Sequence, residues 1–170
     1  MNLPEKFEIL IITLSDRASR GEYEDLSGPR VRDILSDYLS SLGWVFSVKI
    51  TLIPDDASIF REILVNAGDI SNIIITTGGT GIGPRDITVD TVTPLLDKEI
   101  PGIMEFIRIK YGTQSPNALL SRGVAGIIGK SLIYTLPGSV RAVEEYMTEI
   151  LKTLKHTIYM QYGTDVHDKH

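Results

Sequence analysis

The segment IIITTGGTGIGPRDIT, from Ile73 to Thr88, decides the fold and indicates the chemistry. An apolar, β-branched run typical of a short buried strand leads directly into a loop with four glycines. Glycine permits positive φ angles and lets backbone N–H groups come close to an oxyanion, so this glycine loop (residues 78–86) predicts a phosphate or pyrophosphate site. A helix that begins soon afterwards would add its positive end.

The glycine loop matches neither of two common nucleotide-binding patterns. The Gly-Lys-Ser/Thr that would complete a Walker A loop does not follow. Counting six positions from Gly79 and from Gly81 reaches Pro84 and Asp86, where G-x-G-x-x-G requires glycine. A simpler alternative remains open, in which the segment is a tight strand-to-helix turn and Asp86 caps the helix. Four glycines are more than such a cap requires.

Segments with the apolar pattern of strands alternate along the chain with segments that have the pattern of helices. Strands are predicted at residues 7–14, 46–53, 72–77, 124–128 and 131–136. Helices are predicted at residues 30–43, 57–68, 103–112 and 139–161. This order predicts an α/β protein of three layers, α/β/α, with a mostly parallel sheet. Gly129 and Lys130 favour a short antiparallel hairpin between the last two strands.

Polar or glycine-rich segments follow four of the predicted strands. They are SDRASRGEYED (residues 15–25), PDD (54–56), GGTGIGPRD (78–86) and LPGS (136–139). Ligands of parallel α/β sheets bind beyond the carboxyl ends of the strands, so these four segments are expected to meet at one end of the sheet.

Five aspartates fall in or just after these segments: Asp16, Asp55, Asp56, Asp86 and Asp90. Carboxylates beside a phosphate repel it unless a cation lies between them, and Mg²⁺ binds one or two carboxylates together with phosphate oxygens. Arg17 and Arg85 could offset further negative charge. The alternative, which stays open for each single aspartate, is that it caps a helix.

Composition excludes several classes of protein. Acidic residues outnumber basic ones by 22 to 17, and the net charge of −5 gives no global attraction for nucleic acid or an anionic membrane. Cysteine is absent, and the three histidines lack the spacing of zinc ligands. No signal peptide or membrane span is predicted, so we expect a cytoplasmic protein with a single domain, residues 1–163, and a loose polar tail, residues 164–170.

Six motifs occur along the chain in a specific order. They are SDRASRGEYEDLSG (15–28), IPDD (53–56), TTGGTGIGPRDITVDT (76–91), PG (101–102), LSR (120–122) and LPGS (136–139). In this combination, and from about residue 6 to residue 160, the chain resembles the molybdenum cofactor biosynthesis family. It is most similar to the molybdopterin adenylyltransferase (MogA-type) branch, which is related to MoaB and to the G domain of gephyrin.

The resemblance implies a reaction and a set of partners. Family members transfer the adenylyl group of Mg-ATP to the terminal phosphate of molybdopterin, giving adenylyl-molybdopterin and pyrophosphate. Mg²⁺, ATP as co-substrate and molybdopterin as substrate are therefore expected. The resemblance also implies a homotrimer and contacts with other molybdenum cofactor biosynthesis proteins. Such chemistry depends on positioning and charge neutralisation more than on a protein nucleophile, which suits a glycine loop with neighbouring aspartates.

The resemblance also implies roles for individual residues. Asp55 and Asp86 correspond to the two functionally critical aspartates of the family, and Asp86, with Asp55 as a second candidate, is the expected Mg²⁺ ligand. The expected substrate- and phosphate-binding residues are Ser15, Asp16, Gly78, Gly79, Thr80, Gly81, Arg85, Pro137, Gly138 and Ser139. Of these, residues 137–139 correspond to the end that binds the pterin phosphate.

Two positions depart from the family pattern. Val140 and Val89 stand where the family often has proline, and Asp90 keeps the acid that follows. Three alternatives remain: a MoaB-like protein, a non-catalytic pterin-binding or scaffold protein, and a competence-damage-type nucleotide hydrolase domain. Asp55 and Asp86 argue against the scaffold, and the hydrolase normally carries a second domain.

Overall fold

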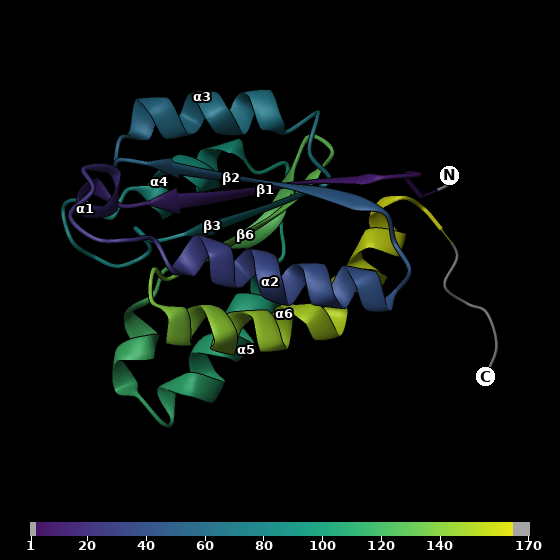
Figure 1. Ribbon diagram of the computed structural model, residues 1–170. Helices are drawn as coiled ribbons and strands as arrows, with labels where there is room; N and C mark the ends of the chain where they lie inside the picture. Colours follow the sequence, from purple (N-terminus) through teal and green to yellow (C-terminus); the bar gives the residue numbers. More distant parts are fainter. Residues whose placement is uncertain (1–2, 165–170) are drawn as a thin grey trace.

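The computed structural model describes residues 3–164, which form a sheet enclosed by helices (Figure 1). The strands are β1 (Phe7–Leu14), β2 (Phe46–Ile53), β3 (Ile73–Thr77), β4 (Lys98–Glu99), β5 (Ala125–Ile128) and β6 (Ser131–Leu136). The α-helices are α1 (Asp16–Ser19), α2 (Ser27–Ser41), α3 (Ala57–Ala67), α4 (Thr88–Val92), α5 (Pro101–Gly112) and α6 (Val140–Gln161). Two 3₁₀ turns, η1 (Thr93–Leu95) and η2 (Pro116–Leu120), flank β4 and α5. Apart from Thr164, the expected tail lies outside the described residues.

The strands form one mostly parallel sheet in the order β2-β1-β3-β6-β5-β4. The first four strands in this order are parallel, while β5 pairs antiparallel with both β6 and β4. The chain leaves β1 toward β2 on one side and returns to β3 on the other, so the order reverses between β1 and β3. Ligands of open α/β sheets bind at such a point.

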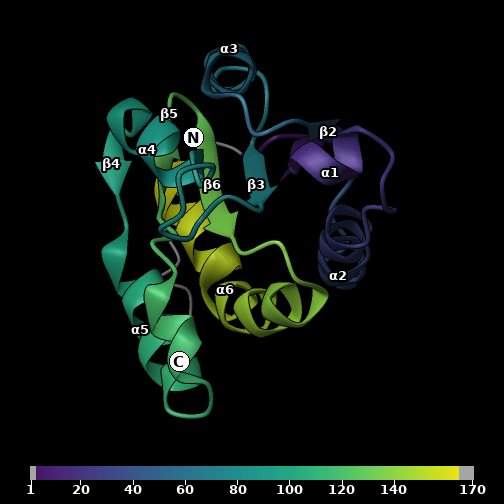
Figure 2. The ribbon, with the colours of Figure 1, turned by 90° about the vertical axis from the view of Figure 1, so that its left-hand side faces the viewer.

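Helices cover both faces of the sheet, which confirms the predicted three layers. Helices α3 and α4 lie on one face, and α2, α5 and α6 lie on the other (Figures 1 and 2). The packing of β1 explains why four successive residues of this strand are apolar. Ile9 and Ile11 pack into the core beneath α2 and α6, while Leu10 and Ile12 pack beneath α3. A strand buried on both faces must be apolar at successive positions.

Most predicted elements are confirmed, including the hairpin at Gly129, and β2 lies at one edge of the sheet. Helix α2, however, begins at Ser27 and not at Arg30. The two-residue strand β4 was not predicted, because a pairing of Lys98 and Glu99 with β5 leaves no periodic pattern in the sequence.

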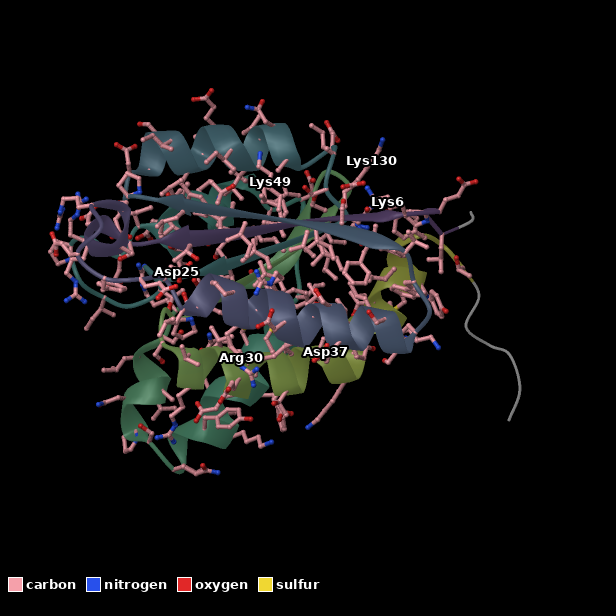
Figure 3. The ribbon with its side chains drawn as sticks, in the orientation of Figure 1. Lys6, Asp25, Arg30, Asp37, Lys49 and Lys130 are labelled. Atoms are coloured by element: carbon pink, nitrogen blue, oxygen red, sulfur yellow. The ribbon has the colours of Figure 1, made fainter. Side chains whose placement is uncertain are left out.

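Charged side chains lie mainly on the outside of the molecule (Figure 3). On α2, Arg30 and Asp37 are exposed, and Arg30 Nε lies 2.8 Å from Glu144 Oε1 on α6. Within residues 3–164, no helix is both long enough and apolar enough to cross a membrane.

Candidate active site

The four segments that were expected to meet do lie together at the carboxyl ends of β1, β2, β3 and β6. The segment after β1 is joined to the end of β2, because Ser15 N–H donates to the carbonyl of Ile53 at 3.0 Å. The segment after β3 is joined to the end of β6, because Gly78 N–H donates to the carbonyl of Leu136 at 2.9 Å. Parallel strands that end at one edge of a sheet bring together loops that lie far apart in the sequence.

The glycine loop starts with two residues in the left-handed region, Gly78 at φ +96° and Gly79 at φ +64°. A Cβ at Gly78 would lie 2.3 Å from the carbonyl oxygen of Leu14, so glycine is required there by contact as well as by conformation. These angles turn the chain sharply away from β3 and toward α4.

In the glycine loop, the carbonyl groups and the N–H groups of the backbone differ in their hydrogen bonding. Four consecutive carbonyls are occupied, since those of Gly78 and Gly79 accept from Thr88 and those of Thr80 and Gly81 accept from Arg122. In contrast, the N–H groups of residues 79–82 donate no hydrogen bond to any group in residues 3–164. A short run of free N–H donors with occupied carbonyls has the properties of an anion-binding nest.

Asp16 and Asp55 are joined by two hydrogen bonds, each from the backbone N–H of one residue to the carboxylate of the other. Asp16 N–H donates to Asp55 Oδ2, and Asp55 N–H donates to Asp16 Oδ1, both at 3.0 Å. Arg85 donates to Asp16 Oδ2 from Nε at 2.9 Å and from Nη2 at 2.6 Å. The hydrogen bonds from Arg85 lower the pKa of Asp16, whereas burial raises the pKa of Asp55. The sequence predicted that both acids lie at the site, but it could not show that their surroundings differ.

Asp86 is part of the glycine loop and does not cap a helix. The N-cap of α4 is Ile87, and no side chain caps that helix. Asp86 Oδ2 instead accepts from Gly83 N–H at 2.7 Å, and it lies so close to Gly81 that a Cβ there would be 2.7 Å from it. The capping alternative for this aspartate is therefore wrong. For Asp56 it is right, because its carboxylate caps α3.

A charged cavity of about 320 Å³ lies beside these acids. Its lining includes Asp16, Asp55, Asp86, Arg85 and Gly79. Among residues 3–164, no group of three or more histidine, cysteine or acidic side chains could by itself hold a metal ion. Mg²⁺ does not need such a cage, since it takes one or two carboxylates and completes its shell with water and phosphate oxygens. With Asp16 paired to Arg85, the carboxylates that fit this demand are Asp55 and Asp86.

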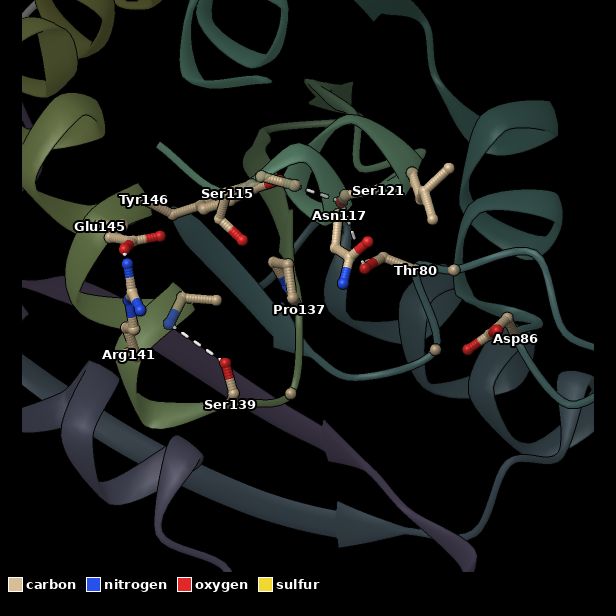
Figure 4. A pocket seen from close by; sticks show the side chains of 16 residues that line it. Thr80, Asp86, Ser115, Asn117, Ser121, Pro137, Ser139, Arg141, Glu145 and Tyr146 are labelled. Carbon is tan, nitrogen blue, oxygen red and sulfur yellow. Dashed lines mark hydrogen bonds and ion pairs between the residues drawn. The ribbon is translucent and has the colours of Figure 1, made fainter. Parts of the chain in front are cut away.

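A larger cavity of about 400 Å³ lies on the other side of the glycine loop (Figure 4). Its lining includes residues 79–81 and Asp86 from the glycine loop, and Pro137, Gly138 and Ser139 from the segment after β6. Ser139 is also the N-cap of α6, where its Oγ accepts from Ala142 N–H at 3.2 Å. Its hydroxyl proton remains available to donate to a bound anion.

Several residues of the larger cavity were not predicted from the sequence. They are Ser115, Asn117 and Ser121 from the connection between α5 and β5, and Arg141, Glu145 and Tyr146 from α6. Tyr146 donates to Ser121 Oγ at 3.0 Å, and Ser121 Oγ lies 3.4 Å from Thr80 Oγ1. Burial raises the pKa of Tyr146. The polar run TQSPN (113–117) was the available signal, but its segment follows a helix and not a parallel strand.

Two other candidate residues make local contacts at the edge of the site. Ser15 is the N-cap of α1, and its Oγ lies 2.7 Å from the hydroxyl of Tyr23. Asp90 lies on α4 and forms an ion pair with Arg122 at 2.9 Å. Whether any of these residues binds a ligand stays a prediction.

The fold and site define a three-layer α/β protein with a candidate anion-binding loop at the switch point of its sheet. The family described as probable molybdopterin binding domain matches residues 10–156. The chain belongs to this family. Its relatives include proteins named molybdopterin adenylyltransferase. The one from Helicobacter pylori is 33% identical over 162 residues, covering 94% of this chain and 90% of the relative, and the one from Pyrococcus furiosus is 37% identical over 166 residues, covering 90% and 92%.

A solved structure shows the same fold. The molybdopterin biosynthesis enzyme MoaB from Thermus thermophilus superposes with a TM-score of 0.82 at 36% identity, covering 92% of this chain and 97% of that chain. The resemblance to the molybdenum cofactor biosynthesis family is thereby confirmed.

Proposed function

We propose that this protein is a molybdopterin adenylyltransferase that acts in molybdenum cofactor biosynthesis. The observation that carries the proposal is the junction of two cavities at Gly79 and Asp86, which line both. A transfer between two phosphate-bearing substrates needs two sites whose phosphates meet, and the free N–H group of Gly79 lies at that junction. The names of the relatives support the same reaction.

In the proposed reaction, a terminal phosphate oxygen of molybdopterin attacks the α-phosphorus of ATP. The bond between that phosphorus and the oxygen bridging it to the β-phosphorus breaks, and pyrophosphate leaves with the electron pair. Bound Mg²⁺ would neutralise phosphate charge during this step. Asp55 and Asp86 would hold the ion, the N–H groups of residues 79–82 would bind phosphate oxygens, and Arg85 would offset further negative charge.

The two substrates are assigned to different cavities. The pterin is placed in the larger cavity, with its phosphate near Pro137, Gly138 and Ser139, because the N-terminus of α6 and the Ser139 hydroxyl provide donors there. The triphosphate is placed in the charged cavity, next to Asp16, Asp55 and Arg85. Ser15 and Asp16 form the first loop of this cavity and fix its shape.

We also propose a cytoplasmic homotrimer that acts together with other molybdenum cofactor biosynthesis proteins, with residues 1–163 as one domain. The resemblance to the family supports the trimer and the partner proteins, and the family match over residues 10–156 supports the single domain. Light scattering of the purified chain tests the trimer, and a mass of one or two subunits would contradict it.

The proposed activity is tested by incubating the purified chain with molybdopterin and Mg-ATP. We expect adenylyl-molybdopterin and pyrophosphate as products, detected by chromatography with mass spectrometry. Asp37→Asn, on the exposed face of α2, serves as a matched control for Asp55→Asn and should retain full activity. Binding of molybdopterin without product would instead favour the MoaB-like or non-catalytic pterin-binding alternative.

A further inference from the structure

Arg122 lines neither cavity, yet it contacts the glycine loop at several points. It lies in the segment that leads into β5, and its backbone N–H donates to the carbonyl of Thr80 at 2.8 Å. Its side chain continues along the loop, with Nε donating to the carbonyl of Gly81 at 2.8 Å and Nη2 to the carbonyl of Asp86 at 3.2 Å. One residue thus holds three carbonyls of the loop.

Asp90 fixes the far edge of the same guanidinium. Arg122 Nη1 lies 2.9 Å from Asp90 Oδ1, and Nη2 lies 2.9 Å from Asp90 Oδ2. This is the two-pronged geometry in which arginine binds a carboxylate most strongly. Because Asp90 lies in the first turn of α4, the guanidinium joins the middle of the glycine loop to the helix that follows it.

The hydrogen bonds to the carbonyls determine where the N–H groups point. A trans peptide is planar, so its N–H points in the direction opposite to its C=O, and no peptide bond within residues 3–164 is cis. Thr88 binds the carbonyls of Gly78 and Gly79, which sets the N–H groups of residues 79 and 80. Arg122 binds the carbonyls of Thr80 and Gly81, which sets the N–H groups of residues 81 and 82 in the same way.

We infer that Arg122 is a positioning residue for phosphate binding: it holds the second half of the glycine loop so that its N–H groups face the ligand, and Asp90 orients its guanidinium. The inference rests on the proposed function, in which these N–H groups bind phosphate oxygens. Arginine is needed because its Nε, Nη1 and Nη2 donors lie in one plane and are all used, whereas lysine offers a single ammonium.

Arg108 provides a matched control within the same part of the chain. Its Nη1 donates to the carbonyl of Gly123 at 2.9 Å and lies 3.5 Å from that of Ser121. It therefore binds the backbone on both sides of Arg122 without contacting the glycine loop. If Arg122 only supported this segment, methionine at either position would have the same effect.

The test compares Arg122→Met with Arg108→Met. In Arg122→Met, we expect Mg-ATP to slow hydrogen exchange in the peptide that covers residues 78–82 less than it does in the wild type, because the free N–H groups of this peptide gain protection only from a bound phosphate. We also expect a loss of about ten- to a hundredfold in Mg-ATP affinity and in kcat/KM, the scale expected when bound groups are misplaced by about 1 Å. Arg108→Met should keep the wild-type exchange of that peptide and stay within about twofold of wild type in both constants. Arg122→Lys should resemble Arg122→Met, and Asp90→Asn should show a smaller loss.

Three outcomes decide the inference. Unchanged loop exchange and Mg-ATP affinity in Arg122→Met would overturn it, and so would equal losses in Arg108→Met. If Arg122→Met does not fold, Arg122→Lys and Asp90→Asn are judged by the same two measurements. If the wild-type protein binds Mg-ATP but forms no adenylyl-molybdopterin, the proposed function fails while the exchange and affinity measurements still test Arg122.

Discussion

Replacing Gly78 with alanine tests how the glycine loop is built. Gly43, just after α2, provides a control, because it also has a positive φ, +69°, but a Cβ there would meet nothing within 4 Å. Both alanine variants incur the left-handed backbone cost of about 1–2 kcal/mol. Only Gly78→Ala also places its Cβ 2.3 Å from the carbonyl oxygen of Leu14.

That contact can be relieved only by moving backbone. The end of β3 must shift away from β1, which weakens the hydrogen bond from Gly78 N–H to the carbonyl of Leu136. Loss of one buried backbone hydrogen bond costs about 1–3 kcal/mol. Gly78→Ala should therefore lower the free energy of unfolding by about 2–5 kcal/mol, and Gly43→Ala by about 1–2 kcal/mol.

Urea unfolding of both variants measures the difference, provided that the dependence of the free energy on urea concentration stays unchanged. Calorimetric titration then measures the affinity for Mg-ATP, which depends on the geometry of the glycine loop. We expect weaker binding in Gly78→Ala, because the shifted strand end carries the N–H groups with it, and wild-type binding in Gly43→Ala. Equal losses of stability in the two variants, or undiminished Mg-ATP binding in Gly78→Ala, would refute this account of the loop.

Four further predictions concern the charged groups and the two substrates. Asp86→Asn should unfold at nearly the wild-type temperature, because the Asp86 carboxylate makes one hydrogen bond to the loop. The same variant should lower kcat about a hundredfold or more. Normal turnover together with a lower melting temperature would instead indicate a structural role for Asp86. Because burial raises the pKa of Asp55 and its ionised form is needed to hold Mg²⁺, activity should be lost as pH falls through a pKa above the usual aspartate range. Arg85→Gln removes a positive charge that lowers the pKa of Asp55, so the acid limb of the kcat/KM profile should move to higher pH, and a shift to lower pH would contradict the assignment. Ser139→Ala should weaken molybdopterin binding about ten- to a hundredfold, because one hydrogen bond to a charged group is lost. Removal of Mg²⁺ with EDTA should weaken ATP binding and leave molybdopterin binding unchanged. The reverse pattern would mean that the two substrates bind at the opposite ends of the site.

The arrangement of the sheet could be predicted from the sequence because it depends on local pattern. The run of four apolar residues in β1, from Ile9 to Ile12, indicates a strand covered on both faces, and the packing of Ile11 and Ile12 into opposite layers explains it. The alternation of strands and helices then places the loops at one end of the sheet. The glycine loop was visible for the same reason, since its left-handed residues require glycine.

The start of helix α2 could not be predicted from the hydrophobic pattern, because it depends on a nearby carboxylate. Helix α2 begins at Ser27, three residues early, because Asp25 Oδ1 accepts from the N–H groups of Ser27 and Gly28. Gly28 and Pro29 interrupt the helical pattern in the sequence, so the start of the helix was expected after them. The carboxylate of Asp25 precedes the helix, so the hydrophobic pattern of the helix does not indicate it.

The roles of the aspartates show the same division most clearly. Sequence alone determined that acids follow the strands, but tertiary structure decided that Asp16 pairs with Arg85, that Asp86 binds the loop, and that Asp90 holds Arg122. These partners lie between 3 and 69 residues away along the chain. Local periodicity reports which face of an element is buried, whereas the partner of a charged side chain depends on which loops the folded sheet brings into contact.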